Sequence, residues 1–473
     1  MTSTRTGARA RHDPGPLGAA VVLVALVVAV VGSLGAPLIT AVASEYGVSL
    51  AAAQWTLTVS LLTGAVTTPV LGRLGAGPRR RGVVVATLAA VVAGGALTVL
   101  PLPFGALLVG RAAQGAGLGL TALMMATARD HLPPQRATGT IAMLSVASTA
   151  GIGIGYPVSG LLTDLAGVRA AYGLGLALTV AALAVAVVVI PPAPPREATP
   201  LDLPGAVLLT ATLLVLLAVV SQTDLWTHHL PVAVGGLGAS ALLLLGWTVV
   251  ELRSPTPLVE VQLLRDPGVA AANLAMLTGG VGMYLLLSLV TRYVQTPGTA
   301  GYGFELTTFQ AGLVLVPFSI LGFVAGRLVP ALRRRLTAQQ VLTAATGVLM
   351  VAFAAFIVIR GHLAGAVIVM GILGAGVGVF SAVMPAVILD ATPTGETASA
   401  MSVNQVVRSV GFSIGSALGG LVLAASTTAG QAFPRPAGYT TAALVGIGVT
   451  TATLLVITTA RTRHPRPTRA QTP

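Results

Sequence analysis

Long apolar runs separated by short polar connections fill almost the whole chain. A helix needs about 20 consecutive apolar residues to cross the roughly 30 Å hydrocarbon core of a bilayer. The runs of this length predict fourteen membrane-spanning helices, called spans 1 to 14 in chain order. They cover residues 17–39, 50–71, 82–101, 105–127, 139–162, 171–191, 203–221, 231–251, 269–294, 308–330, 339–359, 364–388, 399–425 and 438–459. The pattern therefore predicts an all-α polytopic membrane protein.

The composition supports this prediction and excludes several functions. Of the 473 residues, 55% are hydrophobic and 8% are charged, against roughly 25% charged residues in a soluble domain. All 26 basic residues are Arg and there is no Cys, so a P-loop, a Schiff-base lysine, a thiol nucleophile and a disulfide are all excluded. The formal net charge is +13. Because the arginines punctuate apolar runs rather than forming a basic soluble surface, nucleic-acid binding is not expected.

The arginines predict an orientation, because basic residues in short connections are retained on the cytoplasmic side. With the N-terminus inside, 20 Arg fall in cytoplasmic segments. Four lie in outer connections, namely Arg169, Arg292, Arg360 and Arg435. The expected location is the cell membrane, with both termini cytoplasmic and the basic tail against anionic lipid.

An internal repeat groups the spans. Gly72-Arg73-Leu74 followed by Arg79-Arg80-Arg81 recurs 254 residues later as Gly326-Arg327-Leu328 followed by Arg333-Arg334-Arg335. Glycines of spans 4 and 5 recur in spans 12 and 13. Spans 1–6 and 9–14 are therefore predicted to be parallel halves of a transporter, with spans 7 and 8 inserted between them. The predicted domains are an N-terminal tail (1–16), an N-terminal six-helix bundle (17–191), a linker with inserted helices 7 and 8 (192–268), a C-terminal six-helix bundle (269–460) and a basic tail (461–473).

Three motifs carry a family resemblance. The run 111–117, RAAQGAG, is similar to the R-x-x-Q-G-x-G motif of the major facilitator superfamily. The run 151–160, GIGIGYPVSG, resembles the antiporter motif G-x-x-x-G-P-x-x-G-G, with Tyr156 in the place of the usual Pro and Pro157 one position later. The loop after span 2 resembles G-x-L-A-D-R-x-G-R-R. The chain thus resembles the 14-span drug:proton antiporter branch of that superfamily, and the resemblance implies coupling or gating roles for Arg111, Gln114, Arg80, Arg81, Gly151, Gly155, Pro157 and Gly160.

The loop motif departs from the family at one important position. Ala76 stands where the family has an Asp, whereas Arg80 and Arg81 fit the motif. The family's carboxylate latch at the cytoplasmic gate is therefore not expected to form in its usual way.

Two arginines fall within spans, where a guanidinium costs about 2.5 to 3.5 kcal/mol on insertion scales unless it faces a wet cavity or a partner. Arg111 shares a helical face with Gln114, Thr121 and Met125, so this stripe is expected to line a polar cavity. The alternative is a structural tie to neighbouring carbonyl groups.

For Arg408, a cavity-lining role and a structural network with nearby side chains remain equally open. The full set of cavity candidates is Ser33, Thr121, Met125, Asn273, Met283, Met384, Asn404, Gln405 and Arg408. For the methionines, ordinary packing is the alternative. The glycines of span 5 are interpreted as positions of close helix packing.

No Asp or Glu falls in the middle of a span, although proton coupling needs a group that titrates. The candidate proton sites are therefore Glu45, Asp164 and Glu305 at the predicted outer ends. Two embedded arginines without an embedded acid make the cavity positive, which favours neutral or anionic amphiphiles over lipophilic cations.

The combined prediction is a secondary active transporter that exports small amphiphilic molecules by alternating access coupled to proton influx. It is expected to function as a monomer, with no enzymatic activity, cofactor or metal site. The alternative is uptake or facilitated diffusion of a narrow physiological substrate.

Overall fold

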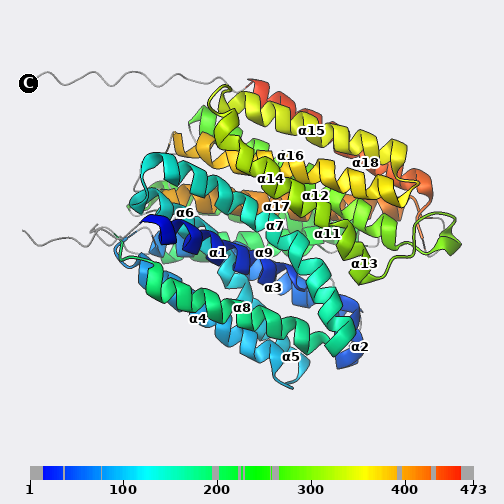
Figure 1. The fold of residues 1–473 in the computed structure, drawn as a ribbon, viewed down its shortest axis with the longest axis horizontal. Helices are drawn as coiled ribbons and strands as arrows, with labels where there is room; N and C mark the ends of the chain where they lie inside the picture. Colours follow the sequence, from blue (N-terminus) through cyan, green and yellow to red (C-terminus); the bar gives the residue numbers. More distant parts are fainter. Residues whose placement is uncertain are drawn as a thin grey trace, which may run out of the picture.

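The computed structural model describes residues 14–35, 38–48, 50–75, 77–193, 202–221, 225–226, 229–255, 257, 261, 266–390, 392, 397–427 and 433–459. The predicted tails, apart from residues 14–16, and Ala76 of the loop motif lie outside the described residues. The described part is helical throughout (Figure 1).

The helices fall into three groups in chain order. The N-terminal half consists of α1 (Pro14–Ser33), α2 (Ile39–Tyr46), α3 (Leu50–Leu74), α4 (Arg80–Val99), α5 (Phe104–Ala116), η1 (Gly117–Gly119), α6 (Leu120–His131), α7 (Pro134–Ala166) and α8 (Val168–Val189). The inserted pair is α9 (Leu203–Ser221) and α11 (Leu230–Arg253). The C-terminal half consists of α12 (Pro267–Gln295), η3 (Gly298–Ala300), α13 (Thr308–Val314), α14 (Val316–Leu332), α15 (Ala338–Ile359), α16 (Leu363–Asp390), α17 (Thr397–Ala425) and α18 (Pro436–Thr459).

Thirteen helical segments are long and apolar enough to cross a membrane. The helix α7, with 33 residues, lies outside those thirteen, so the described chain is compatible with the predicted fourteen spans. Span 1 is shorter than predicted, because α1 ends at Ser33 and the short helix α2 follows. Span 4 is formed by α5, η1 and α6 in succession, and span 10 by α13 and α14.

The sequence repeat corresponds to the same helix crossing in both halves. A Cβ atom added to Gly64 of α3 would lie 3.0 Å from the carbonyl oxygen of Gly115 in α5. In the C-terminal half, a Cβ atom on Gly374 of α16 would lie 2.6 Å from the Cα atom of Phe318 in α14. Phe318 and Gly374 follow Gly64 and Gly115 by 254 and 259 residues, respectively. The repeat therefore preserves the positions at which two helix backbones come together without intervening side chains.

The two halves meet along α7 and α17 (Figure 1). On one side α7 packs against α1, and on the other it packs against α13, α14 and α16. The helix α17 packs against α12 in its own half and against α3 and α6 of the N-terminal half. The inserted helix α9 contacts both α3 and α17, so it covers the seam between the halves at that side.

The up-and-down order of the helices puts most arginines at one end of the bundle. We call this end the arginine-rich face. It carries Arg79–Arg81, Arg129, Arg136, Arg253 and Arg333–Arg335, whereas the opposite face carries Arg169, Arg292, Arg360 and Arg435.

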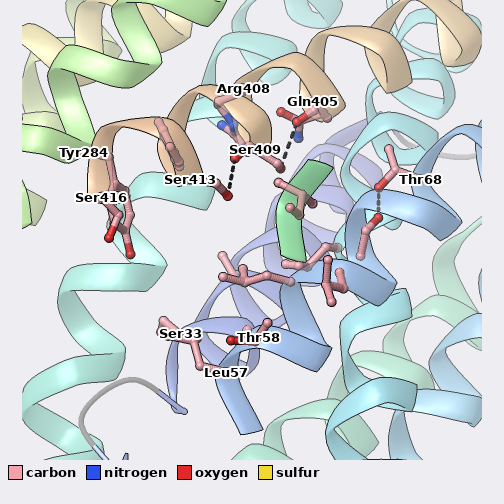
Figure 2. Close-up of a pocket in the computed structure, with 18 of the residues that line it drawn as sticks. Ser33, Leu57, Thr58, Thr68, Tyr284, Gln405, Arg408, Ser409, Ser413 and Ser416 are labelled. Atoms are coloured by element: carbon pink, nitrogen blue, oxygen red, sulfur yellow. Dashed lines mark hydrogen bonds between the residues drawn. The ribbon is translucent and has the colours of Figure 1, made fainter. Parts of the chain in front are cut away.

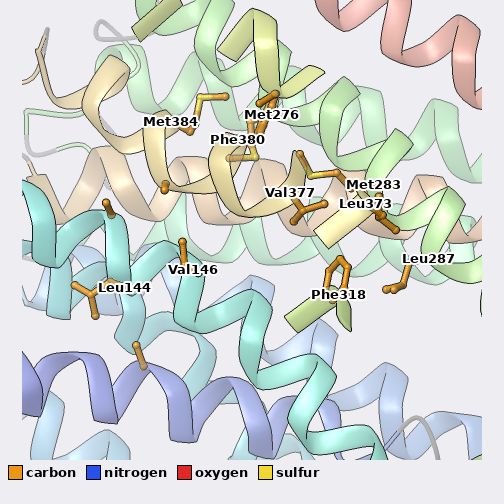
Figure 3. Packing of buried hydrophobic residues seen from close by; sticks show 14 of the residues in the cluster. Leu144, Val146, Met276, Met283, Leu287, Phe318, Leu373, Val377, Phe380 and Met384 are labelled. Atoms are coloured by element: carbon orange, nitrogen blue, oxygen red, sulfur yellow. The ribbon is translucent and has the colours of Figure 1, made fainter. Parts of the chain in front are cut away.

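The predicted cavity methionines of the C-terminal half lie in its core instead. Met283 is 3% exposed and Met384 is fully buried. Figure 3 shows both among Met276, Phe380 and neighbouring leucines. The expectation that Met283 and Met384 line the cavity is therefore wrong. Their flexible thioethers instead fill gaps between α12 and α16, which is the ordinary packing use of Met.

Candidate substrate cavity and gates

A cavity of about 450 Å³ lies between the two halves (Figure 2). Its walls come from α1, α3, η1, α6 and α7 of the N-terminal half, from α9 of the inserted pair, and from α12 and α17 of the C-terminal half. Its polar lining consists of Ser33, Thr58, Thr68, Thr121, Tyr156, Tyr284, Arg292, Gln405, Arg408, Ser409, Ser413 and Ser416. Its size is within the range of sites for drug-sized ligands.

One face of α17 supplies most of this polar surface. Gln405, Ser409, Ser413 and Ser416 are spaced by four, four and three residues, which places them on one side of a helix. The hydroxyl of Ser409 donates to the Gln405 carbonyl at 3.0 Å, and the hydroxyl of Ser413 donates to the Ser409 carbonyl at 3.0 Å. These bonds leave hydroxyl lone pairs facing the cavity as acceptors.

An aromatic shelf lies beside the polar stripe. The rings of Tyr284 in α12 and Phe412 in α17 are stacked, with centroids 5.2 Å apart and an interplanar angle of 29°. Tyr156 of α7 also lines the cavity. The cavity therefore joins apolar ring faces to hydroxyl groups, which suits an amphiphilic ligand.

The cavity is nearer to the opposite face than to the arginine-rich face. Gln405 is eight residues into α17 from the arginine-rich end, which corresponds to about 12 Å along the helix. Arg292, an exposed side chain near the other end of α12, marks the mouth. On the arginine-rich side of Gln405, the described residues enclose a gap of about 10 Å³, lined by residues that include Met125, Asn404 and Arg408. The structure thus represents a state closed at the arginine-rich face.

Arg129 bridges the two halves at the closed end. Its guanidinium on α6 donates to the hydroxyl of Thr397 in α17 at 2.7 Å. It also donates to the carbonyl of Leu389 in the last turn of α16 at 3.3 Å, and to that of Thr392 just after α16 at 3.1 Å. A cation is favourable at a helix C-terminus, where carbonyl groups lack partners within the helix.

A buried ion pair lies next to this bridge, within the N-terminal half. Arg80 at the start of α4 contacts Asp130 at the end of α6 at 2.7 Å, and the side chains are 3% and 2% exposed. Arg80 also donates to the Gly75 carbonyl at 2.7 Å. Arg81 donates to the Val187 carbonyl of α8 at 2.7 Å. An ion pair therefore does form in the region of the loop motif, with Asp130 as the carboxylate, which the motif comparison alone did not predict.

Arg111 is fully buried and lies outside the cavity lining. Its Nε donates to the Thr56 carbonyl at 3.1 Å, and Nη1 donates to the Val31 carbonyl at 3.1 Å and to Gln114 Oε1 at 2.7 Å. Nη2 donates to the Gly32 carbonyl at 3.4 Å. The guanidinium therefore ties α5 to α3 and to the C-terminal carbonyls of α1, which corresponds to the structural alternative.

The predicted stripe from Arg111 to Met125 is interrupted. Thr121 lines the cavity and Met125 lines the small gap, but Arg111 and Gln114 point into the N-terminal half. The 3₁₀ segment η1, at Gly117–Gly119, separates the two pairs. Because a 3₁₀ helix has 3.0 residues per turn instead of 3.6, it rotates the faces before and after it relative to each other.

The glycines of α7 lie at close approaches, as their packing interpretation predicted. A Cβ atom on Gly151 would lie 2.6 Å from the Cβ atom of Ala29 in α1. Gly155 faces Ser33 of α1, whereas Pro157 and Gly160 face α13. A Cβ atom on Gly160 would lie 3.1 Å from the Cα atom of Phe309 in α13. This row of small residues lets α7 pack tightly against both halves.

The other cavity candidates divide between two places. Ser33, Thr121, Gln405 and Arg408 line the cavity. Asn404 lines the small gap and donates to Asn273 Oδ1 of α12 at 3.4 Å, while Asn273 donates to the Val269 carbonyl at 3.0 Å. The two asparagines therefore pair with each other beneath the cavity.

The three candidate proton sites are absent from the cavity lining that the structure describes. Glu45 forms an ion pair with Arg169 at 3.2 Å, and both side chains are partly exposed. Asp164 is exposed near the end of α7, and Glu305 lies in the connection after η3 with a φ of 52°. Burial, followed by the neighbouring Glu45, raises the pKa of the Tyr46 hydroxyl, so this phenol stays protonated at physiological pH.

Sequence reasoning missed the stripe of serines on α17 and both tyrosines of the cavity. The four-residue spacing of Gln405, Ser409 and Ser413 was a usable signal, and so was Tyr156 in the place of a motif proline.

Sequence reasoning also missed two buried carboxylates, those of Asp202 and Glu251, that both lie close to Gly205. An added Cβ on Gly205 would lie 2.6 Å from Glu251 Oε1 and 3.0 Å from Asp202 Oδ2.

A cavity enclosed between two similarly built helical halves, with one end closed by bridging side chains, is the arrangement found in membrane transporters that work by alternating access. The chain belongs to the Major Facilitator Superfamily, whose family model matches residues 21–416.

Similar proteins are named for export, drug resistance or transport, and the chain spans less than two thirds of the length of the first two described here. The chain is 31% identical over 322 residues to the cephamycin export protein of Amycolatopsis lactamdurans, covering 65% of this chain and 63% of that protein. It is 26% identical to a multidrug resistance protein of Mycobacterium tuberculosis, covering 67% and 58%. A probable actinorhodin transporter of Streptomyces coelicolor is 27% identical, covering 80% and 67%. The crystal structure of the human organic anion transporter MFSD10 shares the fold, with a TM-score of 0.64, 15% identity and coverage of 94% and 100%.

Proposed function

We propose that this protein exports small amphiphilic molecules across the cell membrane by alternating access, driven by proton influx. The observation that carries the proposal is the cavity between the halves, which combines apolar rings with hydroxyl groups and is closed at one end by Arg129. Relatives named for cephamycin export and multidrug resistance support the direction of transport.

In this proposal the arginine-rich face is cytoplasmic, following the positive-inside rule. The closed end then faces the cytoplasm, and the cavity represents the state that releases substrate to the outside. Rocking of the halves about α7 and α17 would open the cytoplasmic end, and the small-residue crossings of α7 permit the necessary sliding. The protein would work as a monomer, because both halves of the cavity come from one chain.

The group that couples protons lies outside the cavity in this proposal, because the described lining of the cavity contains serines, threonines, tyrosines, a glutamine and arginines but no carboxylate. Glu45, Asp164 and Glu305 at the outer face remain the candidates for the coupling group.

Export is tested in an efflux-deficient bacterium that expresses the wild-type chain or Ser413→Trp at equal membrane abundance. A tryptophan at position 413 would fill the cavity from its α17 wall without replacing a buried residue. We expect the wild type to protect against some members of a panel of anionic, neutral and cationic antibiotics, and the variant to lose that protection. Increased sensitivity of the wild-type strain would indicate uptake instead. Everted vesicles that accumulate the same compound only with an imposed proton gradient would establish the coupling.

A further inference from the structure

The two arginines within the membrane-spanning helices have opposite environments. Arg111 donates four hydrogen bonds within the protein and is fully buried. Arg408 lines the cavity, and its guanidinium lies 5.8 Å from the centre of the Phe412 ring. In the part of the chain that the structure describes, no hydrogen bond or ion pair joins the Arg408 guanidinium to another residue. Arg111 therefore serves as a structural tie, whereas Arg408 presents an uncompensated charge to the cavity.

An uncompensated guanidinium at this depth is unfavourable unless something else supplies the balancing charge. The described lining of the cavity and of the gap beneath it contains no carboxylate. The ion pairs of Arg80 and Arg169, both among the described residues, lie elsewhere. A bound anion would supply the missing negative charge. A guanidinium matches a carboxylate well, because its planar group donates two parallel hydrogen bonds.

Arg408 also occupies a position that both sides of the membrane can reach in turn. It lines the floor of the large cavity, meaning the end nearest the arginine-rich face, and it also lines the adjoining gap of about 10 Å³. When the arginine-rich end opens, that gap would widen into the second access route. A ligand held by Arg408 would therefore stay bound while access changes from one face to the other.

The neighbours of Arg408 indicate what accompanies the negative charge. Phe412 lies next to the guanidinium and stacks on Tyr284, so the two rings form a flat apolar surface beside the charged group. Arg292 at the mouth adds a second positive charge to the cavity, which favours the entry of anions. Figure 2 shows Arg408, Ser409 and Ser413 close together on α17, with Tyr284 to the left of Ser413.

We infer that Arg408 is the anion-binding residue of the transport site and that the preferred substrates are aromatic molecules bearing a carboxylate. This inference deepens the proposed function by naming its substrate class. It assigns the charge of the site to Arg408 alone and leaves Arg111 as a structural residue. Arg292 contributes to attraction at the mouth and makes no contact with the bound carboxylate.

Three probes that share one ring system test this inference by equilibrium binding. The full chain is purified into nanodiscs of zwitterionic lipid, and 2-naphthoate, 2-naphthamide and 2-naphthylmethylammonium are measured against empty nanodiscs. We expect the carboxylate to bind the wild type about tenfold or more tightly than the amide, as for a charge-assisted pair, and the cation to bind most weakly. Equal or tighter binding of the cation, or no binding of any probe, overturns the inference.

Variants assign the preference to a residue. Arg408→Gln should bring the carboxylate and the amide to within threefold of each other, and Arg408→Lys should retain part of the preference, because Lys keeps the charge without the planar fork. Arg136→Gln, at an exposed arginine outside the cavity lining, is the matched control and should keep the wild-type ranking. Retention of the full preference in Arg408→Gln, or its loss in Arg136→Gln alone, contradicts the assignment. If Arg408→Gln does not fold, a reduced preference in Arg408→Lys beside a full preference in Arg136→Gln supports the assignment, and equal preferences contradict it.

These measurements are separate from the test of export. Anion-selective binding without protection of cells would refute export and leave the Arg408 site standing. Protection by the wild type without anion-selective binding would refute the site and leave export standing.

Discussion

Arg129 of α6 and Thr397 of α17 are joined by a hydrogen bond of 2.7 Å that crosses from one half of the protein to the other. The same guanidinium reaches the carbonyls of Leu389 and Thr392 in the C-terminal half. In contrast, Arg80 pairs with Asp130 in its own half. Arg129 thus links the two halves at this end. The neighbouring Asp130 binds Arg80 and so holds α6, the helix that carries Arg129, against α4.

Arg129→Ala should therefore weaken closure of the arginine-rich end. A hydrogen bond to a charged group contributes roughly 1.5 to 3 kcal/mol, so we expect the open population to rise about tenfold or more. The chain has no Cys, so Ser145→Cys at the small gap provides a single reporter. Its labelling rate by a membrane-impermeable maleimide, added to vesicles that expose the arginine-rich face, measures the opening.

Arg136→Ala is the matched control for this gate, because Arg136 is an exposed arginine on the same face. Its labelling rate should match that of the parent chain. Unchanged labelling in Arg129→Ala would show that the bridge does not hold the end closed.

Arg111→Gln should destabilise the N-terminal half. The shorter neutral side chain cannot reach the carbonyls of Val31, Gly32 and Thr56 together, and buried carbonyls without donors are unfavourable. We expect a lower thermal unfolding midpoint in detergent and a lower yield in the membrane. Arg169→Gln, which removes a partly exposed ion pair, should leave the midpoint nearly unchanged. A stable Arg111→Gln variant that binds substrate but does not transport it would instead place Arg111 in the coupling mechanism that the family resemblance implies.

The span pattern and the glycine repeat were predictable because both depend on local rules. Helices of membrane-spanning length need apolar runs, and close crossings need small residues, so Gly115 and Gly374 could be matched from the sequence alone. The side to which Arg111 points could not be predicted, because η1 changes the helical phase between Arg111 and Thr121. Met283 was misplaced for another reason: its core partners come from α16, and no local pattern shows which neighbours a helix will have.

Gly115→Ala and Gly374→Ala should destabilise the protein to a similar degree. A Cβ on Gly115 would lie 2.9 Å from the Cα atom of Ser60, and one on Gly374 would lie 2.6 Å from the Cα atom of Phe318. Because the opposing atoms belong to the backbone, neither site can adjust by moving a side chain. Gly347→Ala, where an added Cβ meets nothing within 4 Å, is the control and should be neutral or slightly stabilising. Thermal unfolding of the three purified variants checks this, and a large effect at only one repeat position would argue against equivalent crossings.

The triple variant Glu45→Gln, Asp164→Asn and Glu305→Gln addresses proton coupling. If these outer acids carry the coupling proton, removing all three should abolish accumulation driven by a proton gradient. Exchange of labelled for unlabelled substrate across vesicles without a gradient should persist, because the cavity and its Arg408 floor are unchanged. Exchange therefore serves as the internal control for folding and binding. If gradient-driven accumulation survives in the triple variant, coupling does not depend on these acids. The next pair to neutralise would then be Asp202 and Glu251, whose buried carboxylates face Gly205 in the inserted helices.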